Sequence, residues 1–437
     1  MEDEATIFQV LSRFTKVGVQ ASSLALKLAG EKFLGVEIDP SVHASSLKKV
    51  LGSFKGPVMK VAQFLSMVPD ALPKEYAEEF LTLQSQAPSM GAVFVKRRLQ
   101  TELTPLWHKK FQSFDLKASA AASLGQVHEA YTLTGGKLAC KLQYPQMESA
   151  VKSDLSQLKL ALSMYEGFFK TLETQNIFEE IQERLLEELD YEQEAKNCKI
   201  YGKIFKNTSD IIIPTVYDDL STKRLLTMSW IDGKSLLAFE NEPQELKDNI
   251  AVTLFKAWYY PLYNFGIIHG DPHPGNYLWT PDQKLALLDF GCVRYFPPSF
   301  IEAVIYLYQA LLHKDQKKLC EAFERWGFKN LSQELIEAMS LWAQLLFEPL
   351  LEDKIRPLKT FEDGKKGWDI ATKVHALLKK HGGVKPPKEF VFMDRSAVGI
   401  GSMIMKLNAS HNWHQLFENL IEDFSPSKIE KNLENLN

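Results

Sequence analysis

A short loop and a later strand end hold the residues with the clearest chemical potential. The loop spans residues 269–276 and reads HGDPHPGN, and Asp-Phe-Gly begins thirteen residues after its asparagine. Phosphoryl transfer requires a carboxylate near the attacking oxygen and metal ligands that bridge the triphosphate of ATP, and this pattern supplies both. It predicts Asp271 as the base or water-orienting group, and Asn276 and Asp289 as ligands of Mg²⁺.

The same loop has two simpler interpretations. Gly, Pro, Asn and Asp favour tight turns for purely local reasons, so the loop could be a surface turn. His269 and His273 form an HxxxH pair, but the glycine and prolines around them disfavour the regular helix that would place both imidazoles on one metal. Because the loop and the Asp-Phe-Gly sequence occur together at kinase spacing, we expect phosphoryl transfer and histidines that orient the loop.

Lys141 is the candidate phosphate ligand upstream. It lies in the alternating segment LACKLQY, residues 138–144, which is similar to the V-A-I-K strand of kinases. The lysine of that strand contacts the α- and β-phosphates and pairs with a helix glutamate. A solvated lysine on a strand would show the same alternation. The segments around Lys141 favour the catalytic role.

The segment before this strand, residues 118–127, reads ASAAASLGQV. It occupies the place of the glycine-rich loop that closes over the phosphates in kinases, but only Gly125 remains. Alanine methyl groups restrict the backbone and should prevent the usual closure. An alanine-rich helix start is the alternative interpretation. The predicted nucleotide-contacting residues are Ala120, Ala121, Ala122 and Ser123.

An acidic segment follows in residues 178–198, which we expect to form one continuous helix. On such a helix Glu183, Glu187, Asp190 and Glu194 would share one face. Stacked carboxylates repel one another, so they require solvent or a cation. Since the glutamate partner of the phosphate-binding lysine lies on a helix after its strand, at least one acid should face Lys141.

The elements that position these residues divide the chain into three regions. Residues 1–110 read as helix, 111–230 as a small mixed lobe with a sheet, and 231–437 as a mostly helical lobe. Residues 211–230 resemble two strands around a turn, and YLWT and LALLDF a second strand pair. This order of elements predicts a protein-kinase-like α+β fold. The polar tail from Ser425 should fray.

A helical pattern resumes soon after Asp-Phe-Gly. Residues 301–312 read IEAVIYLYQALL, which leaves no long activation segment and no Ala-Pro-Glu sequence. A polypeptide substrate therefore has little to dock on.

Composition narrows the functional class. The 437 residues are 45% hydrophobic and carry a net charge of −4, which gives no reason to expect a nucleic-acid partner. The four cysteines lie far apart without a CxxC pair, which argues against zinc and disulfides. No apolar run reaches the length of a membrane span, and the first 30 residues do not show the basic region and small-residue cleavage site of a secretory signal, so we expect none. We expect a cytoplasmic protein, or one peripheral to the inner face of a membrane.

Five motifs taken together resemble the UbiB family of atypical kinases, which is associated with ubiquinone biosynthesis and isoprenoid-lipid metabolism. They are AAASLGQVH, CKLQYP, EELDYEQEA, HGDPHPGN and LLDFG. The motifs cover roughly residues 55–300 in the family's order, and their combination is highly specific. The resemblance implies a two-lobed kinase-like fold with an all-helical N-terminal extension packed over the cleft. It also implies that Lys141 pairs with Glu194, and that Glu188 and Asp190 form the family's Glu-x-Asp motif.

The family's Lys-x-Gly-Gln helix maps onto residues 60–63, which read KVAQ. The resemblance makes Lys60 and Gln63 regulatory residues that cover the active site and reach the Glu-x-Asp acids. Ala62 replaces the family's glycine, and its methyl group puts the docking of this helix in doubt.

The resemblance implies an ATP- and Mg²⁺-dependent kinase or ATPase that is autoinhibited by its N-terminal helix and supports quinone or isoprenoid-lipid metabolism. The expected partners are nucleotide, a lipid or quinone-precursor molecule, a membrane surface, and proteins of quinone biosynthesis. Two alternatives stay open: a small-molecule kinase of the aminoglycoside or choline phosphotransferase type, and a nucleotide-sensing scaffold without turnover.

Overall fold

The computed structural model describes residues 91–436, except for 123, 154, 157–158, 160–173, 329–330, 359–372, 375–376 and 378–387. The predicted N-terminal extension, with Lys60 and Gln63, therefore lies outside the described residues apart from its last part. The chain forms two compact units. The first comprises residues 1–195 and 216–230, and the second comprises residues 196–215 and 231–437.

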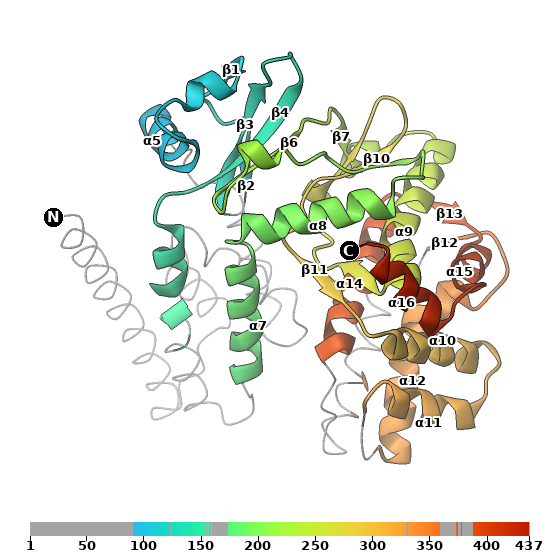
Figure 1. Ribbon diagram of the computed structural model, residues 1–437. Coiled ribbons are helices and arrows are strands. Elements are labelled where there is room, and N and C mark those ends of the chain that lie inside the picture. The colour runs from blue at the N-terminus through green and yellow to red at the C-terminus, as the bar shows by residue number, and fades with distance from the viewer. Residues whose placement is uncertain are drawn as a thin grey trace, which may run out of the picture. The chain divides into compact units, whose positions relative to one another are not determined.

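The first unit contains an antiparallel sheet in the order β1-β3-β4-β6, with β2 paired to β3 (Figure 1). Its strands are β1 Ser113–Phe114, β2 Ala120–Ala122, β3 Gly125–Tyr131, β4 Lys137–Gln143 and β6 Leu225–Ser229. The turn between β3 and β4 contains Gly135, whose φ of 88° suits glycine. The expected small mixed lobe of residues 111–230 contains this sheet, but residues 196–215 of that range belong to the second unit.

Helix α5, Ala92–Leu103, covers this sheet and is followed by the short helix η1, Trp107–Lys110. The apolar side of α5, formed by Val95, Leu99 and Leu103, is buried in one cluster with Cys140 and its strand neighbours. Burial of the Cys140 thiol raises its pKa to about 12. This cysteine therefore contributes to packing and is not a reactive thiolate.

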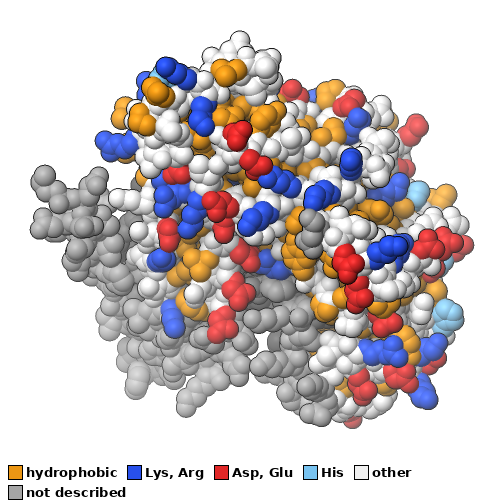
Figure 2. All heavy atoms as spheres, in the orientation of Figure 1, with side chains coloured by type: hydrophobic (Ala, Val, Ile, Leu, Met, Phe, Trp, Pro, Cys, Tyr) orange, Lys and Arg blue, Asp and Glu red, His pale blue; other side chains and the backbone are white. Residues whose placement is uncertain are grey.

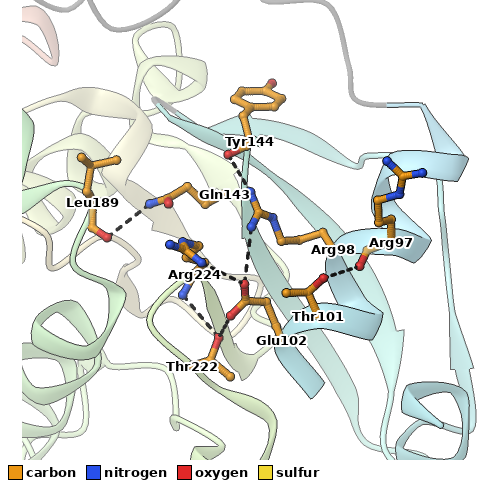
Figure 3. Close-up of polar contacts among 9 residues, drawn as sticks. All are labelled: Arg97, Arg98, Thr101, Glu102, Gln143, Tyr144, Leu189, Thr222 and Arg224. Atoms are coloured by element: carbon orange, nitrogen blue, oxygen red, sulfur yellow. Dashed lines mark hydrogen bonds and ion pairs between the residues drawn. The ribbon is translucent and has the colours of Figure 1, made fainter. Parts of the chain in front are cut away.

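A polar network also attaches α5 to the sheet (Figure 3). The Thr222 hydroxyl donates to Glu102 Oε2 at 2.7 Å. Arg98 lies 3.5 Å from the same carboxylate, and its other terminal nitrogen donates to the carbonyl of Tyr144 at 3.1 Å. Arg224 approaches Glu102 to 3.8 Å. Glu102 therefore connects the helix to the turn before β6, and Arg98 connects it to the end of β4.

The acidic segment forms two helices rather than one. Helix α7, Thr174–Glu187, ends before a turn, and α8, Tyr191–Ile204, begins after it. Asp190 caps α8, because its carboxylate accepts a hydrogen bond from the backbone N–H of Gln193 at 3.0 Å. The expectation of a continuous helix with four acids on one face is therefore wrong. A side-chain cap and the buried Leu189 break the helix where its periodicity alone continues.

The described residues of the second unit form three small sheets. The first has the order β5-β10-β9-β7, with β5 parallel to β10, the second pairs β8 with β11, and the third pairs β12 with β13, Arg356–Pro357 with Ser410–His411. The strands are β5 Ile211–Ile212, β7 Lys234–Ser235, β8 Ile267–His269, β9 Tyr277–Trp279, β10 Leu285–Leu287 and β11 Val293–Tyr295. The antiparallel pair β9 and β10 confirms the prediction for YLWT and LALLDF.

Residues 211–230 behave differently from the expected strand pair. Val216 bridges Met228 within the first unit, while β5 pairs with β10 in the second unit. The β5 strand is two residues long, so its partner depends on the surrounding packing more than on its own sequence.

Most of the second unit is helical. Its helices and short helical turns are α9 Gln244–Phe265, η4 Pro274–Asn276, α10 Pro298–Leu312, α11 Gln316–Arg325, α12 Gln333–Phe347, η5 Glu348–Leu350, α14 Lys388–Lys406, α15 Trp413–Ile421 and α16 Pro426–Glu434. The turns η2 Asp218–Leu220 and η3 Leu236–Phe239, and the strand pair β12 Arg356–Pro357 and β13 Ser410–His411, complete the described elements. The central helix α9 ends at Gly266, whose φ of 66° permits a left-handed cap.

The C-terminal tail is ordered. Ile429 of α16 is fully buried, and Asn432 donates to the carbonyl of Asn264 at the end of α9 at 2.8 Å. The prediction of a frayed tail is wrong, because α16 packs against α9 and α10 and buries Ile429.

Among the described helices, none is both long enough and apolar enough to cross a bilayer. On the face drawn in Figure 2, acidic and basic side chains are interspersed and do not gather into a patch of one sign.

Candidate active site

His269 connects the HGDPHPGN loop to the Asp-Phe-Gly segment. The buried imidazole contacts the backbone carbonyl of Asp289 through Nε2, and its Nδ1 accepts a hydrogen bond from the N–H of Asp271 at 3.3 Å. Since the carbonyl can only accept, Nε2 carries the proton. His273 accepts from the N–H of Gly275 at 3.1 Å and caps the turn η4. Each histidine therefore orients the backbone of the loop.

The predicted catalytic and metal-binding residues of the second unit lie together. The amide nitrogen of Asn276 donates to Asp271 Oδ2 at 3.0 Å. The N–H of Leu288 donates to the carbonyl of Asn276 at 3.0 Å, which places Asp289 directly after a strand bonded to this loop. Asp289 Oδ1 accepts from the N–H of Gly291 at 2.9 Å.

The donor atoms at this position fit Mg²⁺. Asp271 and Asp289 offer carboxylate oxygens, and Asn276 retains its amide oxygen because its amide nitrogen bonds to Asp271. Mg²⁺ prefers such hard oxygen ligands and rarely requires a cage made only of protein atoms. Asn276 and Asp289 are therefore suitable metal ligands.

Buried aromatic residues pack against His269 and Phe290, at the two segments that carry the candidate site. Trp258 of α9 donates to the hydroxyl of Tyr277 at 2.7 Å, and Tyr201 packs against Phe290 with ring centroids 5.2 Å apart. Burial raises the pKa of Tyr277 well above its ordinary value, and the nearby charge of Asp271 raises it further. The phenol therefore stays neutral and supports the loop without exchanging a proton.

The structure adds Asn197 to the residues that sequence reasoning identified. Its side-chain amide donates to the carbonyl of Phe290 at 2.9 Å, and the side chain is buried. It therefore fixes the middle residue of Asp-Phe-Gly. The only signal in the sequence is its place three residues after Glu194, which does not indicate a contact with a segment more than ninety residues later.

In the first unit, the structure brings Lys141 and Glu194 together. The ammonium group of Lys141 donates to the two carboxylate oxygens at 2.7 and 2.9 Å. The side chains are 13% and 2% exposed, and the ammonium lies 5.1 Å from the centre of the Tyr191 ring. Glu194, one of the four acids predicted to share one face, therefore faces this lysine.

Gln143, two residues after Lys141 on β4, is a positioning residue that sequence reasoning missed. Its side-chain amide donates to the carbonyl of Leu189 at 3.2 Å (Figure 3). Leu189 is the middle residue of Glu-x-Asp, so β4 fixes both α8 and the turn that carries Glu188 and Asp190. The strand alternation places Gln143 on the face of Lys141, which is the signal that would have identified it.

The alanine segment is a strand of a tight hairpin. Ala120 pairs with Val127, and Ala122 with Gly125, so the alternative of a helix start is wrong. A Cβ on Gly125 would contact the carbonyl oxygen of Leu142 and lie 3.0 Å from the hydroxyl of Tyr191. The one glycine left in this segment therefore permits a close approach to β4. Ser123 lies outside the described residues.

Comparisons with known proteins show what this chain is similar to. A family model described as ABC1 atypical kinase-like domain matches residues 82–323. The chain is 30% identical over 335 residues to ACTIVITY OF BC1 COMPLEX KINASE 3 of Arabidopsis thaliana, which is chloroplastic, covering 75% of this chain and 47% of that protein. It is 26% identical over 402 residues to the mitochondrial atypical kinase COQ8B of Danio rerio, covering 89% of this chain and 62% of that protein.

A solved structure has the same fold. The Rv3197 protein of Mycobacterium tuberculosis, determined in complex with erythromycin, superposes with a TM-score of 0.62 at 27% identity, covering 86% of this chain and 95% of that one. The chain spans about half the length of the curated relatives it matches. These matches confirm a kinase-like fold and the family resemblance.

Proposed function

Because the chain belongs to the UbiB family, whose ABC1 atypical kinase-like domain covers residues 82–323, we propose that it is an ATP- and Mg²⁺-dependent phosphotransferase or ATPase. The observation that carries the proposal is the grouping of Asp271, Asn276 and Asp289 around one hydrogen-bonded loop. A turn with a purely local role does not require a buried histidine, whereas here His269 connects the loop to the backbone of Asp289 in the Asp-Phe-Gly segment.

Each residue of this group has a defined task in the proposal. Asp271 accepts a proton from the attacking hydroxyl or orients the attacking water, and Asn276 keeps its carboxylate in place. Asn276 and Asp289 hold Mg²⁺, which neutralises developing charge on the phosphates when it is bound. Gly291 and His269 restrain Asp289 through its side chain and its backbone carbonyl.

Lys141 is proposed to bind the phosphates of the nucleotide, and Glu194 to orient it. Ala120, Ala121, Ala122 and Ser123 are proposed to line the nucleotide, from a hairpin that lacks the bare backbone of a glycine-rich loop. We therefore expect slow basal turnover.

Regulation through the extension remains a proposal. Lys60 and Gln63 would engage Glu188 and Asp190, which lie at the break between α7 and α8. Such a contact would hold the enzyme in a low-activity state until a ligand releases it.

The proposed acceptor is water or a small molecule rather than a polypeptide. After Gly291 the chain forms the short strand β11 and then enters α10 at Pro298, which leaves no segment for docking a peptide. The family association suggests a lipid or a quinone precursor as the substrate or activating ligand, contact with the inner face of a membrane, and proteins of quinone biosynthesis as partners.

The first test is Mg²⁺-dependent phosphate release from ATP, with and without anionic liposomes and a phenolic quinone-precursor analogue. We expect wild type to release phosphate, and Asp289→Asn and Asp271→Asn each to lose about 10²–10⁴-fold in kcat. Asp282→Asn is the matched control, since this carboxylate lies at an exposed position in the turn between β9 and β10 and pairs only with the exposed Lys284 among the ion pairs of the described residues. These variants are preferable to Lys141→Met, which would leave the buried Glu194 without its cation at a cost of about 3–5 kcal/mol.

Two outcomes would replace the proposal. Nucleotide binding without phosphate release under every condition would favour the scaffold. Stoichiometric phosphorylation of a hydroxylated small molecule, without release of free phosphate, would favour the small-molecule kinase, for which the HGDPHPGN loop is the supporting observation.

A further inference from the structure

Helix α14, Lys388–Lys406, lies beyond the matched family domain and yet contacts the catalytic loop. The contact is made at Gly399. A Cβ built on this glycine would lie 2.6 Å from the Cβ of Pro272 and closer still to its Cγ, whereas ordinary contacts of this kind are 3.4–4 Å. These are atoms of a proline ring, which cannot rotate away as a flexible side chain would. At the middle of α14, only glycine fits against the loop.

The loop is held from another direction as well. The N–H of Gly270 donates to the carbonyl of Cys292 at 2.6 Å, and a Cβ on Gly270 would lie 2.6 Å from the Cys292 sulfur. His269 contacts the carbonyl of Asp289. The residues before Asp271 are therefore fixed against the β11 segment, and Pro272 after it is fixed against α14.

From this geometry we propose that Gly399 is a positioning residue for Asp271, and that α14 forms part of the catalytic apparatus. The inference rests on the proposed function of Asp271. Proline has a fixed φ, so a shift of the Pro272 ring passes into the backbone on which Asp271 lies. Asp271 then loses its alignment with Asn276, which donates to it at 3.0 Å.

The direction of the effect separates this role from simple helix stability. A glycine in a helix interior is destabilising relative to alanine, so Gly399→Ala should favour α14 if packing were irrelevant. Gly401 is the matched control, since it lies two residues later on the same helix. A Cβ on Gly401 would meet only Leu358 Cδ2, at an ordinary 3.8 Å.

The experiment compares Gly399→Ala and Gly401→Ala by kcat and KM for ATP, with liposomes present, and by amide hydrogen exchange of residues 267–276. We expect Gly399→Ala to lose about 10²-fold in kcat, the effect of a displacement of about 1 Å, with KM for ATP unchanged and faster exchange in the loop. Gly401→Ala should match wild type in all three. A wild-type kcat and unchanged loop exchange in Gly399→Ala would overturn the proposal.

A second variant removes the opposing ring. Pro272→Gly deletes the three ring atoms that the new methyl group would meet, so adding Gly399→Ala to Pro272→Gly should cause no further loss of kcat. If Gly399→Ala alone fails to fold, recovery of folding in the double variant supports the same contact. An undiminished effect of Gly399→Ala on the Pro272→Gly background would contradict it.

Hydrogen exchange keeps the two proposals distinguishable. If wild type shows no turnover, the proposed function fails, while faster exchange of the loop in Gly399→Ala, and not in Gly401→Ala, still supports α14 as its support. If wild type turns over ATP and Gly399→Ala does so equally well, only the further inference fails.

Discussion

Histidines show how position decides the role of a residue in this protein. His269 uses both ring nitrogens on backbone groups of the HGDPHPGN loop and the Asp-Phe-Gly segment, and His128 of β3 also uses both ring nitrogens in contacts within the first unit. His128 Nδ1 contacts the carbonyl of Asp115 at 2.8 Å, and its Nε2 contacts the amide nitrogen of Gln126 at 2.8 Å. The neutral imidazole satisfies both contacts, with the proton on Nδ1.

His128 gives a prediction for pH. Burial lowers its pKa in the folded protein, so the unfolded chain binds more protons as the medium is acidified. The stability contribution of neutral His128 is complete above about pH 6.5, the ordinary histidine pKa, and is lost as the pH falls through the lower folded pKa. Urea unfolding between pH 7.5 and 5 should show a smaller decline of stability in His128→Asn than in wild type. Parallel curves would contradict this prediction.

At the level of elements, the break between α7 and α8 matters more than either helix alone. It places Glu188 and Asp190 in a turn and leaves Glu194 on α8 to pair with Lys141. The Gln143 side chain supports that turn through the carbonyl of Leu189. One strand therefore determines where both groups of acids lie.

Gln143→Leu tests this arrangement. The substitution leaves the carbonyl of the buried Leu189 without this donor, so we expect a loss of about 1–3 kcal/mol in the free energy of unfolding. Hydrogen exchange at residues 188–190 should become faster. Gln112→Leu, at an exposed position of the same unit, is the control and should change neither quantity appreciably. Unchanged hydrogen exchange at residues 188–190 in Gln143→Leu would show that the turn does not depend on the hydrogen bond from Gln143.

At the scale of the whole molecule, the two units are interleaved along the chain. The chain leaves the first unit after residue 195, returns at 216, and leaves again after 230. Residues 196–215 therefore belong to the second unit, although they precede part of the first in sequence. They contribute Cys198, Tyr201 and Phe205 to its buried residues and β5 to its sheet.

Truncation tests this interleaving. A fragment of residues 231–437 lacks the buried side chains of residues 196–215, each contributing about 1.5–3 kcal/mol, while the net stability of a domain is only about 5–15 kcal/mol. We expect this fragment not to unfold cooperatively when heated and followed by circular dichroism, and a fragment of residues 196–437 to do so. Cooperative unfolding of the shorter fragment would show that residues 196–215 are dispensable.

The sequence by itself predicted the chemistry and determined the class of fold. HGDPHPGN, LLDFG and the lysine of LACKLQY are local patterns, and their residue types and spacing are visible without a structure. The strand pair β9 and β10 was predictable because a tight turn joins two alternating segments. Such features depend on neighbours in sequence.

Tertiary structure alone decided which distant residues meet. Packing and hydrogen bonding in the folded chain fix four contacts that the sequence does not show. They are the cap by Asp190, the hydrogen bond from Asn197 to Phe290, the parallel pairing of β5 with β10, and the close contact of Gly399 with Pro272. The helical periodicity of residues 178–198 continues through Asp190 and so does not predict the break there. The periodicity of α14 does not predict that Gly399 contacts Pro272. The reason is physical: periodicity records which face of an element is buried, whereas the partner on that face depends on the whole fold.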